Sequence, residues 1–234
     1  QWVMEDHFIN GRPAMEEVGV TLTDDVGPFE LMKLRMLNGG HAAIAYPASL
    51  LGLHTVQEAM AHPMINGFLE KLEREEIIPT VPPIPGVDRG DYLCLIKRRF
   101  ANPEIKDTIP RLCQDGSNRQ PKFILPSTRD RLDQGQTVAG LALVSALWCR
   151  YCYGETEAGT PIDIDDIQAG RLREVARRAR TSPSEFLALR DIFGDIADNP
   201  EFSTTFETTL TELWRDGVAK TMTNYVNSTR DLSK

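Results

Sequence analysis

The segment of residues 28–44 constrains the fold more than any other part of the chain, because it is apolar on almost every side yet carries a few polar groups. Lys33, Asn38 and His41 follow one another there in the pattern Lys-x4-Asn-x2-His. At about 100° per residue, an α-helix places His41 about 80° and Asn38 about 140° from Lys33, and Glu30 shares this side at about 60°. A helix that is hydrophobic nearly all round is normally buried. The segment therefore predicts a buried helix with one polar side.

These residue types together favour an active site. A lysine in a pocket that excludes water has its charged form disfavoured, so its pKa falls toward neutrality and it can act as a base. The amide of Asn38 and the imidazole of His41 are neutral groups that can stabilise an alkoxide or polarise a carbonyl. Gly39 and Gly40 would let a substrate or a neighbouring backbone come close. For each residue alone a structural role is the favoured interpretation, and it is the combination that points to catalysis.

Several other stretches share a pattern with a known family. They are Gln1-Trp-Val-Met-Glu-Asp-His-Phe8, Gly11-Arg-Pro13, Val18-Gly-Val20, Thr23-Asp-Asp-Val26, and Arg111 through Asp115-Gly-Ser117 to Pro121-Lys-Phe123. With residues 33–41, they make almost the whole chain similar to the polyol-specific long-chain dehydrogenases. In that family a lysine, an asparagine and a histidine lie on one helix of a C-terminal helical domain. The lysine is the general base that takes the hydroxyl proton while hydride leaves the same carbon for the nicotinamide, and no metal is used.

The resemblance implies a role for each matching residue. Lys33 would be the general base, Asn38 would form half of an oxyanion site, and His41 would orient the substrate hydroxyl. Arg111 would bind the polyol chain. Arg119 stands where the family usually has a lysine, and guanidinium and ammonium are not interchangeable at a directional site, so we treat it as a candidate second substrate contact.

Glu30 is a further candidate at this site. It lies one turn before Lys33 on the same side of the predicted helix, so it could pair with the lysine or pass its proton to water. An ordinary glutamate–lysine pair on a helix surface explains the spacing equally well.

The resemblance also implies the substrate and cofactor classes. The reaction would interconvert a sugar alcohol and its ketose with NAD or NADP, and mannitol and fructose are the favoured pair. A hexuronate reductase such as fructuronate reductase, an arabinitol dehydrogenase, and a non-catalytic helical interaction module remain alternatives. No stretch reads as a strand, a Gly-x-Gly-x-x-Gly turn and a helix, so the cofactor would be bound mainly by a domain outside this chain. We therefore expect the chain alone to be inactive.

The predicted architecture is mainly α-helical. Residues 1–26 contain two short β-type runs and are predicted to be the trailing edge of a Rossmann nucleotide-binding domain, and residues 27–234 a helical substrate-binding and catalytic domain. Helices are expected at about 28–46, after Thr55, and at 63–76, 91–100, 103–114, 127–133, 137–153, 164–180, 183–197 and 200–227. Asp24 and Asp25 are expected to cap the first of them, and Pro47 to kink or end it.

Composition and net charge limit the classes of molecule that this protein is expected to bind. A formal net charge of -8 argues against nucleic acid, which needs a clustered positive field. No apolar run approaches the 18 or so residues of a membrane span, and the start shows no secretion signal, so we expect a soluble cytoplasmic protein with a small-molecule substrate. The four cysteines fit no disulfide framework or metal spacing and are predicted to be reduced core residues. The sequence leaves the oligomeric state open.

Overall fold

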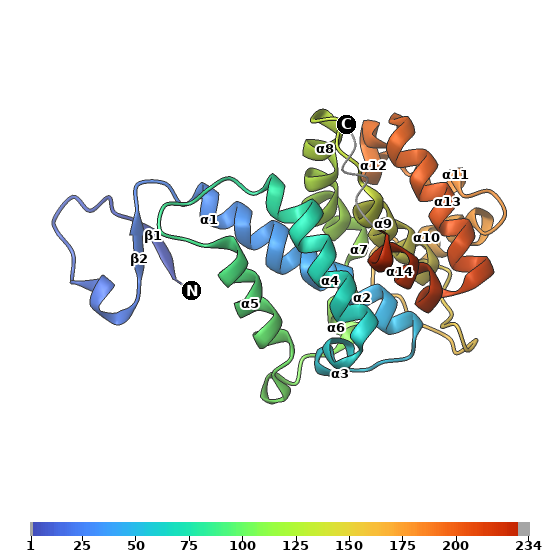
Figure 1. Cartoon of the computed structure of the whole chain (residues 1–234), viewed down its shortest axis with the longest axis horizontal. Coiled ribbons are helices and arrows are strands. Elements are labelled where there is room, and N and C mark those ends of the chain that lie inside the picture. The colour runs from blue at the N-terminus through green and yellow to red at the C-terminus, as the bar shows by residue number, and fades with distance from the viewer. Residues whose placement is uncertain (1, 229–234) are drawn as a thin grey trace.

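The structure is a computed structural model that describes residues 2–228. It is built mainly from helices, with a small two-stranded sheet at one end (Figure 1), so the predicted mainly α-helical fold is confirmed. Residue 1 of the predicted N-terminal segment and residues 229–234 of the predicted helical domain lie outside the described part of the chain. None of the described helices is both long enough and apolar enough to cross a membrane.

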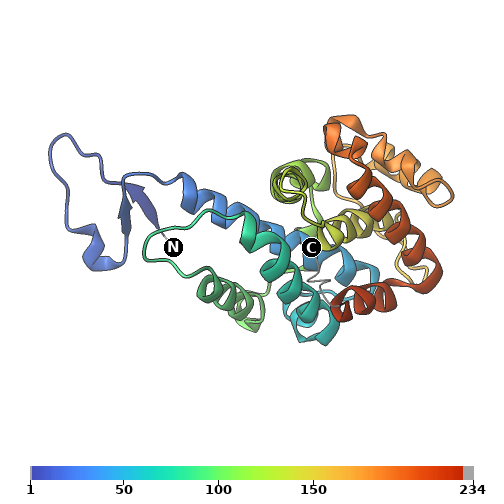
Figure 2. The same ribbon diagram turned by 45° about the horizontal axis from the view of Figure 1, so that its top comes forward.

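The N-terminal residues 2–26 form an arm that projects from the helical body (Figures 1 and 2). Its strands β1 (Val3–Glu5) and β2 (Thr21–Thr23) are parallel, with Val3 opposite Thr21. A single turn of 3-10 helix, Met15–Val18, lies in the connection between them. A parallel pair of three-residue strands buries little surface, so the arm has no core of its own.

The helical body contains fourteen α-helices among the described residues. Those of the first half are α1 (Gly27–Met32), α2 (Gly39–Leu50), α3 (Val56–Ala61), α4 (Pro63–Leu72), α5 (Arg89–Phe100), α6 (Ile109–Cys113) and α7 (Gly116–Arg119). Those of the second half are α8 (Leu125–Asp133), α9 (Ala139–Cys152), α10 (Ala169–Ala179), α11 (Ser184–Leu187), α12 (Arg190–Phe193), α13 (Pro200–Asp216) and α14 (Val218–Asn227).

Shorter helical turns join these elements. Three segments are π-helical, with i→i+5 hydrogen bonds, and they are Lys33–Asn38, Glu73–Ile77 and Gln120–Ile124. Three further turns are 3-10 helical, and they are Ile78–Thr80, Pro103–Ile105 and Gly194–Asp198. Helix α1, the π-segment Lys33–Asn38 and α2 follow one another without a gap and form a spine that runs from the arm into the body (Figure 2).

The core of the body is organised around α9. Every residue of this helix except its first is buried, as its largely apolar sequence predicts. Helices α2, α8, α10 and α13 pack around it. The spine and the C-terminal helices are therefore anchored on one central helix, which fixes the position of α2 and of the residues that it carries.

Several predicted helix boundaries are wrong, two of them in long helices. The predicted helix over residues 200–227 is interrupted at Gly217, whose φ of 84° is left-handed, so α13 and α14 change direction there. Helix α2 continues through Pro47 to Leu50 instead of ending near Tyr46. Pro47 lies in the last turn of α2, and burial of Ala48 and Leu50 outweighs the lost backbone hydrogen bond.

The predicted start signals are largely confirmed. Asp25 Oδ1 accepts a hydrogen bond of 2.8 Å from the amide of Gly27, the first residue of α1. Thr55 and Glu58 form a capping box at the start of α3. The helices predicted at 103–114 and 164–180 begin later, at Ile109 and Ala169, and the helix predicted at 183–197 is divided into α11, α12 and a 3-10 turn. Local sequence signals therefore predict the presence of helices better than their lengths.

Candidate active site

The predicted active-site helix corresponds to the spine, which is only partly buried. In α2, ten of the twelve residues are buried against the body. Towards the arm, however, the side chains of Glu30 and Lys33 are exposed, and those of Asn38 and His41 are half-buried. The predicted burial of Lys33 is therefore wrong for the described chain. The physical reason is that no described element covers the Glu30 and Lys33 face of the spine.

The π-segment changes how the polar residues are arranged. In an α-helix, residues four apart lie nearly above one another, whereas i→i+5 bonding brings residues five apart into that relation. Lys33 and Asn38 are five apart and lie at the two ends of the π-segment. His41 follows three residues later in α-helical backbone, where i and i+3 side chains are neighbours. The π-segment therefore places the three residues closer to one line than the 140° calculated for a regular α-helix.

His41 is held in its neutral form at neutral pH. Burial lowers the pKa of His41 to about 4, because the surroundings disfavour the imidazolium. The negative charge of Asp107 opposes this shift, whereas three nearby cations reinforce it, and these are Arg111, Arg119 and Lys33. Lys33 makes the smallest of these contributions, and it is not among the residues that line the pocket beside His41. A neutral imidazole can both donate and accept a hydrogen bond.

A pocket of about 400 Å³ opens beside His41. Its walls come from α2, the start of α3, the end of α5 and the loop that leads to α6. The ring of Phe100 stacks on the imidazole of His41, with centroids 4.2 Å apart and planes inclined by 17°. This stack accounts for part of the desolvation of His41 and fixes its ring plane at the pocket wall.

Arg111 reaches the same pocket from α6 and is paired within it. Its Nε donates to Asp107 Oδ1 at 2.5 Å, and an Nη donates to the other oxygen of the same carboxylate. This forked contact lowers the pKa of Asp107, with Arg111 as the main cause. Together the two side chains present donors and acceptors that can bind hydroxyl groups.

Arg119 is not among the residues that line the pocket. Its Nη1 donates to the carbonyl of Leu112 at 2.6 Å, so one of its donors is used inside the protein. Its charge still contributes to the low pKa of His41. Ser117, in the adjacent Asp-Gly-Ser turn, is bonded to Asp166 through both its amide and its hydroxyl, at 2.8 Å each. This turn therefore has a structural role in the described chain.

Sequence reasoning missed two residues of the site and one backbone feature. Asp107 precedes Arg111 by four residues, a spacing typical of an ion pair on a helical turn, and this signal was available. Phe100 lies at the end of a predicted helix, and nothing in its sequence context indicates a stack on His41. The π-segment has no sequence signature that a fixed rotation of 100° per residue could detect.

The remaining titratable clusters do not suggest a metal centre. Among residues 2–228, no group of three or more His, Cys, Asp or Glu side chains is arranged to hold a metal ion. Cys113, Cys149 and Cys152 are free and buried, as predicted, and burial raises their pKa values. Cys94 is exposed on α5, so the prediction of a core position is wrong there.

Comparison with known proteins identifies the domain. The family model described as the mannitol dehydrogenase C-terminal domain matches residues 25–214. Mannitol 2-dehydrogenase of Cereibacter sphaeroides is 52% identical over 226 residues, which are 97% of this chain and 47% of that protein. Mannitol 2-dehydrogenase of Aspergillus fumigatus is 39% identical over 231 residues, or 97% of this chain and 46% of that protein. The chain thus spans about half the length of these relatives.

Solved structures agree with the sequence relatives. The ternary complex of Pseudomonas fluorescens mannitol 2-dehydrogenase with NAD and D-mannitol superposes with a TM-score of 0.89 at 36% identity, over 97% of this chain and 46% of that one. A D-sorbitol dehydrogenase in substrate-free form superposes with a TM-score of 0.87 at 25% identity, over 94% of this chain and 46% of that one. On this evidence of sequence and fold, the chain belongs to the mannitol dehydrogenase family and corresponds to its C-terminal domain.

Proposed function

We propose that the protein containing this chain is an NAD- or NADP-dependent polyol dehydrogenase that interconverts D-mannitol and D-fructose. Membership of the mannitol dehydrogenase family supports the reaction class, and the relatives named mannitol 2-dehydrogenase support the substrate pair. The observation that carries the proposal is a pocket whose wall holds His41 and the Arg111–Asp107 pair, beside the helical spine that also carries Lys33 and Asn38. The predicted cytoplasmic location stays a prediction.

The open face of the spine fits the reacting end of a nicotinamide. Glu30 and Lys33 are exposed there, and the pocket beside His41 adjoins the same spine. The phosphates of a dinucleotide have no glycine-rich turn to bind in this sequence. We propose that a nucleotide-binding domain supplies that turn, that residues 1–26 are its trailing edge, and that residues 27–234 form the catalytic domain. When bound, the nicotinamide accepts or returns a hydride.

Residues of this chain then carry out the remaining steps of the reaction. In alcohol oxidation the free amine of Lys33 takes the proton of the reacting hydroxyl, while the electron pair of the C–H bond leaves as hydride and the C–O bond becomes a carbonyl. Asn38 donates through its amide to the negative charge that develops on the oxygen. His41 orients the hydroxyl. Closure of the proposed nucleotide-binding domain over Lys33 would exclude the water that reaches it in this chain.

Two other contacts complete the proposed site. Arg111, held by Asp107, binds hydroxyl groups further along the polyol, because both partners lie in the pocket and keep hydrogen-bonding capacity. Arg119 acts through its charge and remains a second candidate for contact with the substrate. Glu30 lies exposed one turn before Lys33, and we propose that it passes the proton between the lysine and water.

The proposal is tested on the full gene product. It is mixed with NAD or NADP and with mannitol, sorbitol or arabinitol, or with the reduced cofactor and fructose or fructuronate, and the absorbance of the reduced nicotinamide is followed. Mannitol and fructose should turn over fastest. Lys33→Ala should lower kcat by about 100- to 10,000-fold. Lys220→Ala, which removes an exposed lysine of α14, is the matched control and should leave kcat unchanged.

Three other outcomes would change the proposed function or the assignment of the base. Preference for fructuronate or arabinitol would replace the proposed substrate pair by another branch of the family. A full gene product that turns over none of these substrates would favour a non-catalytic interaction module. Full activity of Lys33→Ala would overturn the assignment of the general base.

A further inference from the structure

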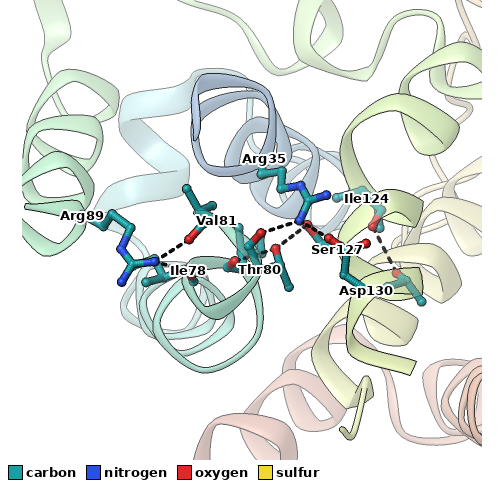
Figure 3. A network of polar contacts seen from close by, with 10 residues as sticks. Arg35, Ile78, Thr80, Val81, Arg89, Ile124, Ser127 and Asp130 are labelled. Carbon is teal, nitrogen blue, oxygen red and sulfur yellow. Dashed lines mark hydrogen bonds and ion pairs between the residues drawn. The ribbon is translucent and has the colours of Figure 1, made fainter. Parts of the chain in front are cut away.

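Arg35 is a buried arginine in the π-segment, between Lys33 and Asn38. Its side chain is only 8% exposed. Its Nη1 donates to the carbonyl of Thr80 at 2.6 Å and to Asp130 Oδ2 at 2.5 Å (Figure 3). These partners come from the turn Ile78–Thr80 and from α8, so one side chain ties the spine to two separate elements.

The π-segment is packed against the other two π-segments of the described chain, Glu73–Ile77 and Gln120–Ile124. At Gly39, which follows the first π-segment, an added Cβ would lie 3.3 Å from the carbonyl oxygen of Phe123 and 3.8 Å from Ile77 Cδ1. Helical segments with i→i+5 bonds are rare and occur mostly as single turns at functional sites. The segment thus contacts the rest of the body through this close packing and through Arg35.

Stability alone is a poor explanation for Arg35. Burial removes water from the Arg35 guanidinium, whereas Asp130 stays 40% exposed, so solvent screens their attraction and the pair offsets this cost only in part. In addition, the Nε of Arg35 has no hydrogen-bond partner among the described residues, which adds a desolvation cost. The side chain does constrain the positions of its partners, because a guanidinium fixes hydrogen-bond geometry more strictly than an ammonium does.

We propose that Arg35, bonded to Thr80 and Asp130, is a positioning residue that holds the π-segment and so keeps Lys33 in line with Asn38 and His41. The inference rests on the proposed function, because it assigns Arg35 to the alignment of the proposed base. Without the two contacts, the segment would relax toward regular α-helix. Lys33 and Asn38 would then diverge toward the 140° separation of a regular helix.

The test uses the full gene product with Arg35→Lys and, separately, Asp130→Asn. Arg35→Lys keeps the charge but shortens the side chain and removes the planar guanidinium. Asp130→Asn changes a side chain that is 40% exposed, so the fold should tolerate it. Arg89→Lys is the matched control. Arg89 also donates to carbonyls beside Thr80, those of Ile78 and Val81, but it does not touch the π-segment (Figure 3).

Misalignment of the base should act on the chemical step. We expect kcat to fall about 10- to 100-fold in Arg35→Lys, and less in Asp130→Asn, with KM for the polyol changed by less than about threefold. The isotope effect with substrate deuterated at the reacting carbon should increase, because hydride transfer becomes rate-limiting. Arg89→Lys should match the wild type in all three quantities, and thermal unfolding should show that each variant is folded.

The outcomes separate this inference from the proposed function. If the wild type is active and Lys33→Ala is not, but Arg35→Lys and Arg89→Lys have equal kcat values and isotope effects, the positioning role of Arg35 is wrong and the assignment of Lys33 stands. If Lys33→Ala is as active as the wild type, the proposed function itself fails. An Arg35→Lys variant that is folded and raises only KM would also overturn the positioning role.

Discussion

His41 shows how the surroundings of one side chain set its chemistry. Stacking on Phe100 and burial beside the pocket favour the neutral ring, and the cations of Arg111, Arg119 and Lys33 act in the same direction. A neutral histidine can turn either a donor or an acceptor toward a hydroxyl group, which an imidazolium cannot do. The site thus gains a hydrogen-bonding group whose protonation does not change across the physiological pH range.

The state of His41 can be measured directly. A titration of the imidazole followed by NMR, assigned with His41→Gln, should give a pKa of about 4. Because the pKa in the folded state lies below the unfolded value, stability is complete above about pH 6.5 and is lost as the pH falls toward 4. The loss relative to His41→Gln should reach up to about 3 kcal/mol. A midpoint near pH 6.5 would show that the ring is not desolvated.

Glu73 is a buried carboxyl group without a role in the proposed reaction. It is fully buried in the second π-segment, its Oε1 lies 3.2 Å from where a Cβ on Gly40 would be, and neither oxygen has a hydrogen-bond partner among the described residues. Burial raises the pKa of Glu73 well above its ordinary value, and Glu70 adds to the shift. Burial therefore favours the protonated form of Glu73 in the folded protein.

Replacing Glu73 by glutamine tests this state. A raised pKa in the folded protein means that the wild type loses stability as the pH rises above about 4.5, whereas Glu73→Gln does not lose this contribution. The free energy of unfolding of Glu73→Gln minus that of the wild type should thus be larger at pH 8 than at pH 5, as measured by urea unfolding. A difference that stays constant over this range would show that Glu73 is not buried in a proton-bound form.

At the scale of elements, the sequence predicted which segments are helical, but not where a helix breaks or where it becomes π-helical. Apolar periodicity, Thr55 and the Asp25 cap located most helices because these are local signals. The break at Gly217 depends on a left-handed φ that glycine permits but does not require. The π-segment depends on contacts between Arg35 and distant elements. Such contacts cannot be read from periodicity.

The packing of α7 against the core helix α9 gives a test at this scale. A Cβ added to Gly116 would lie 2.4 Å from Trp148 Nε1, so Gly116→Ala forces the indole or the helix to move. We expect it to lower the free energy of unfolding by about 1–3 kcal/mol. Gly170→Ala is the matched control in α10, where nothing lies within 4 Å, and it should stabilise by up to about 1 kcal/mol. Equal effects in urea unfolding would mean that α7 is not packed as described.

At the scale of the whole molecule, burial of the proposed base was the prediction that failed. The sequence pattern implied a covered helix, and the body does cover α2, but the Glu30 and Lys33 face is open. The arm beside it also exposes apolar side chains, with Ile9 97% and Val18 83% exposed. Periodicity predicts that a face is apolar, but it cannot say which other part of a protein covers it. The site residues matched to the family stay proposals until they are tested in the full gene product.

The central claim is that Lys33 removes the proton from the alcohol, and chemical rescue tests it most directly. In full-length Lys33→Ala, small primary amines such as methylamine and ethylamine should restore polyol oxidation in proportion to the concentration of the free amine, and more strongly for the more basic amine. Tertiary amines of similar basicity, which are too bulky for the space left by one lysine side chain, should restore little. A Lys33→Ala enzyme that is inactive and gains no rate from any primary amine, or one that is already fully active, would contradict the account.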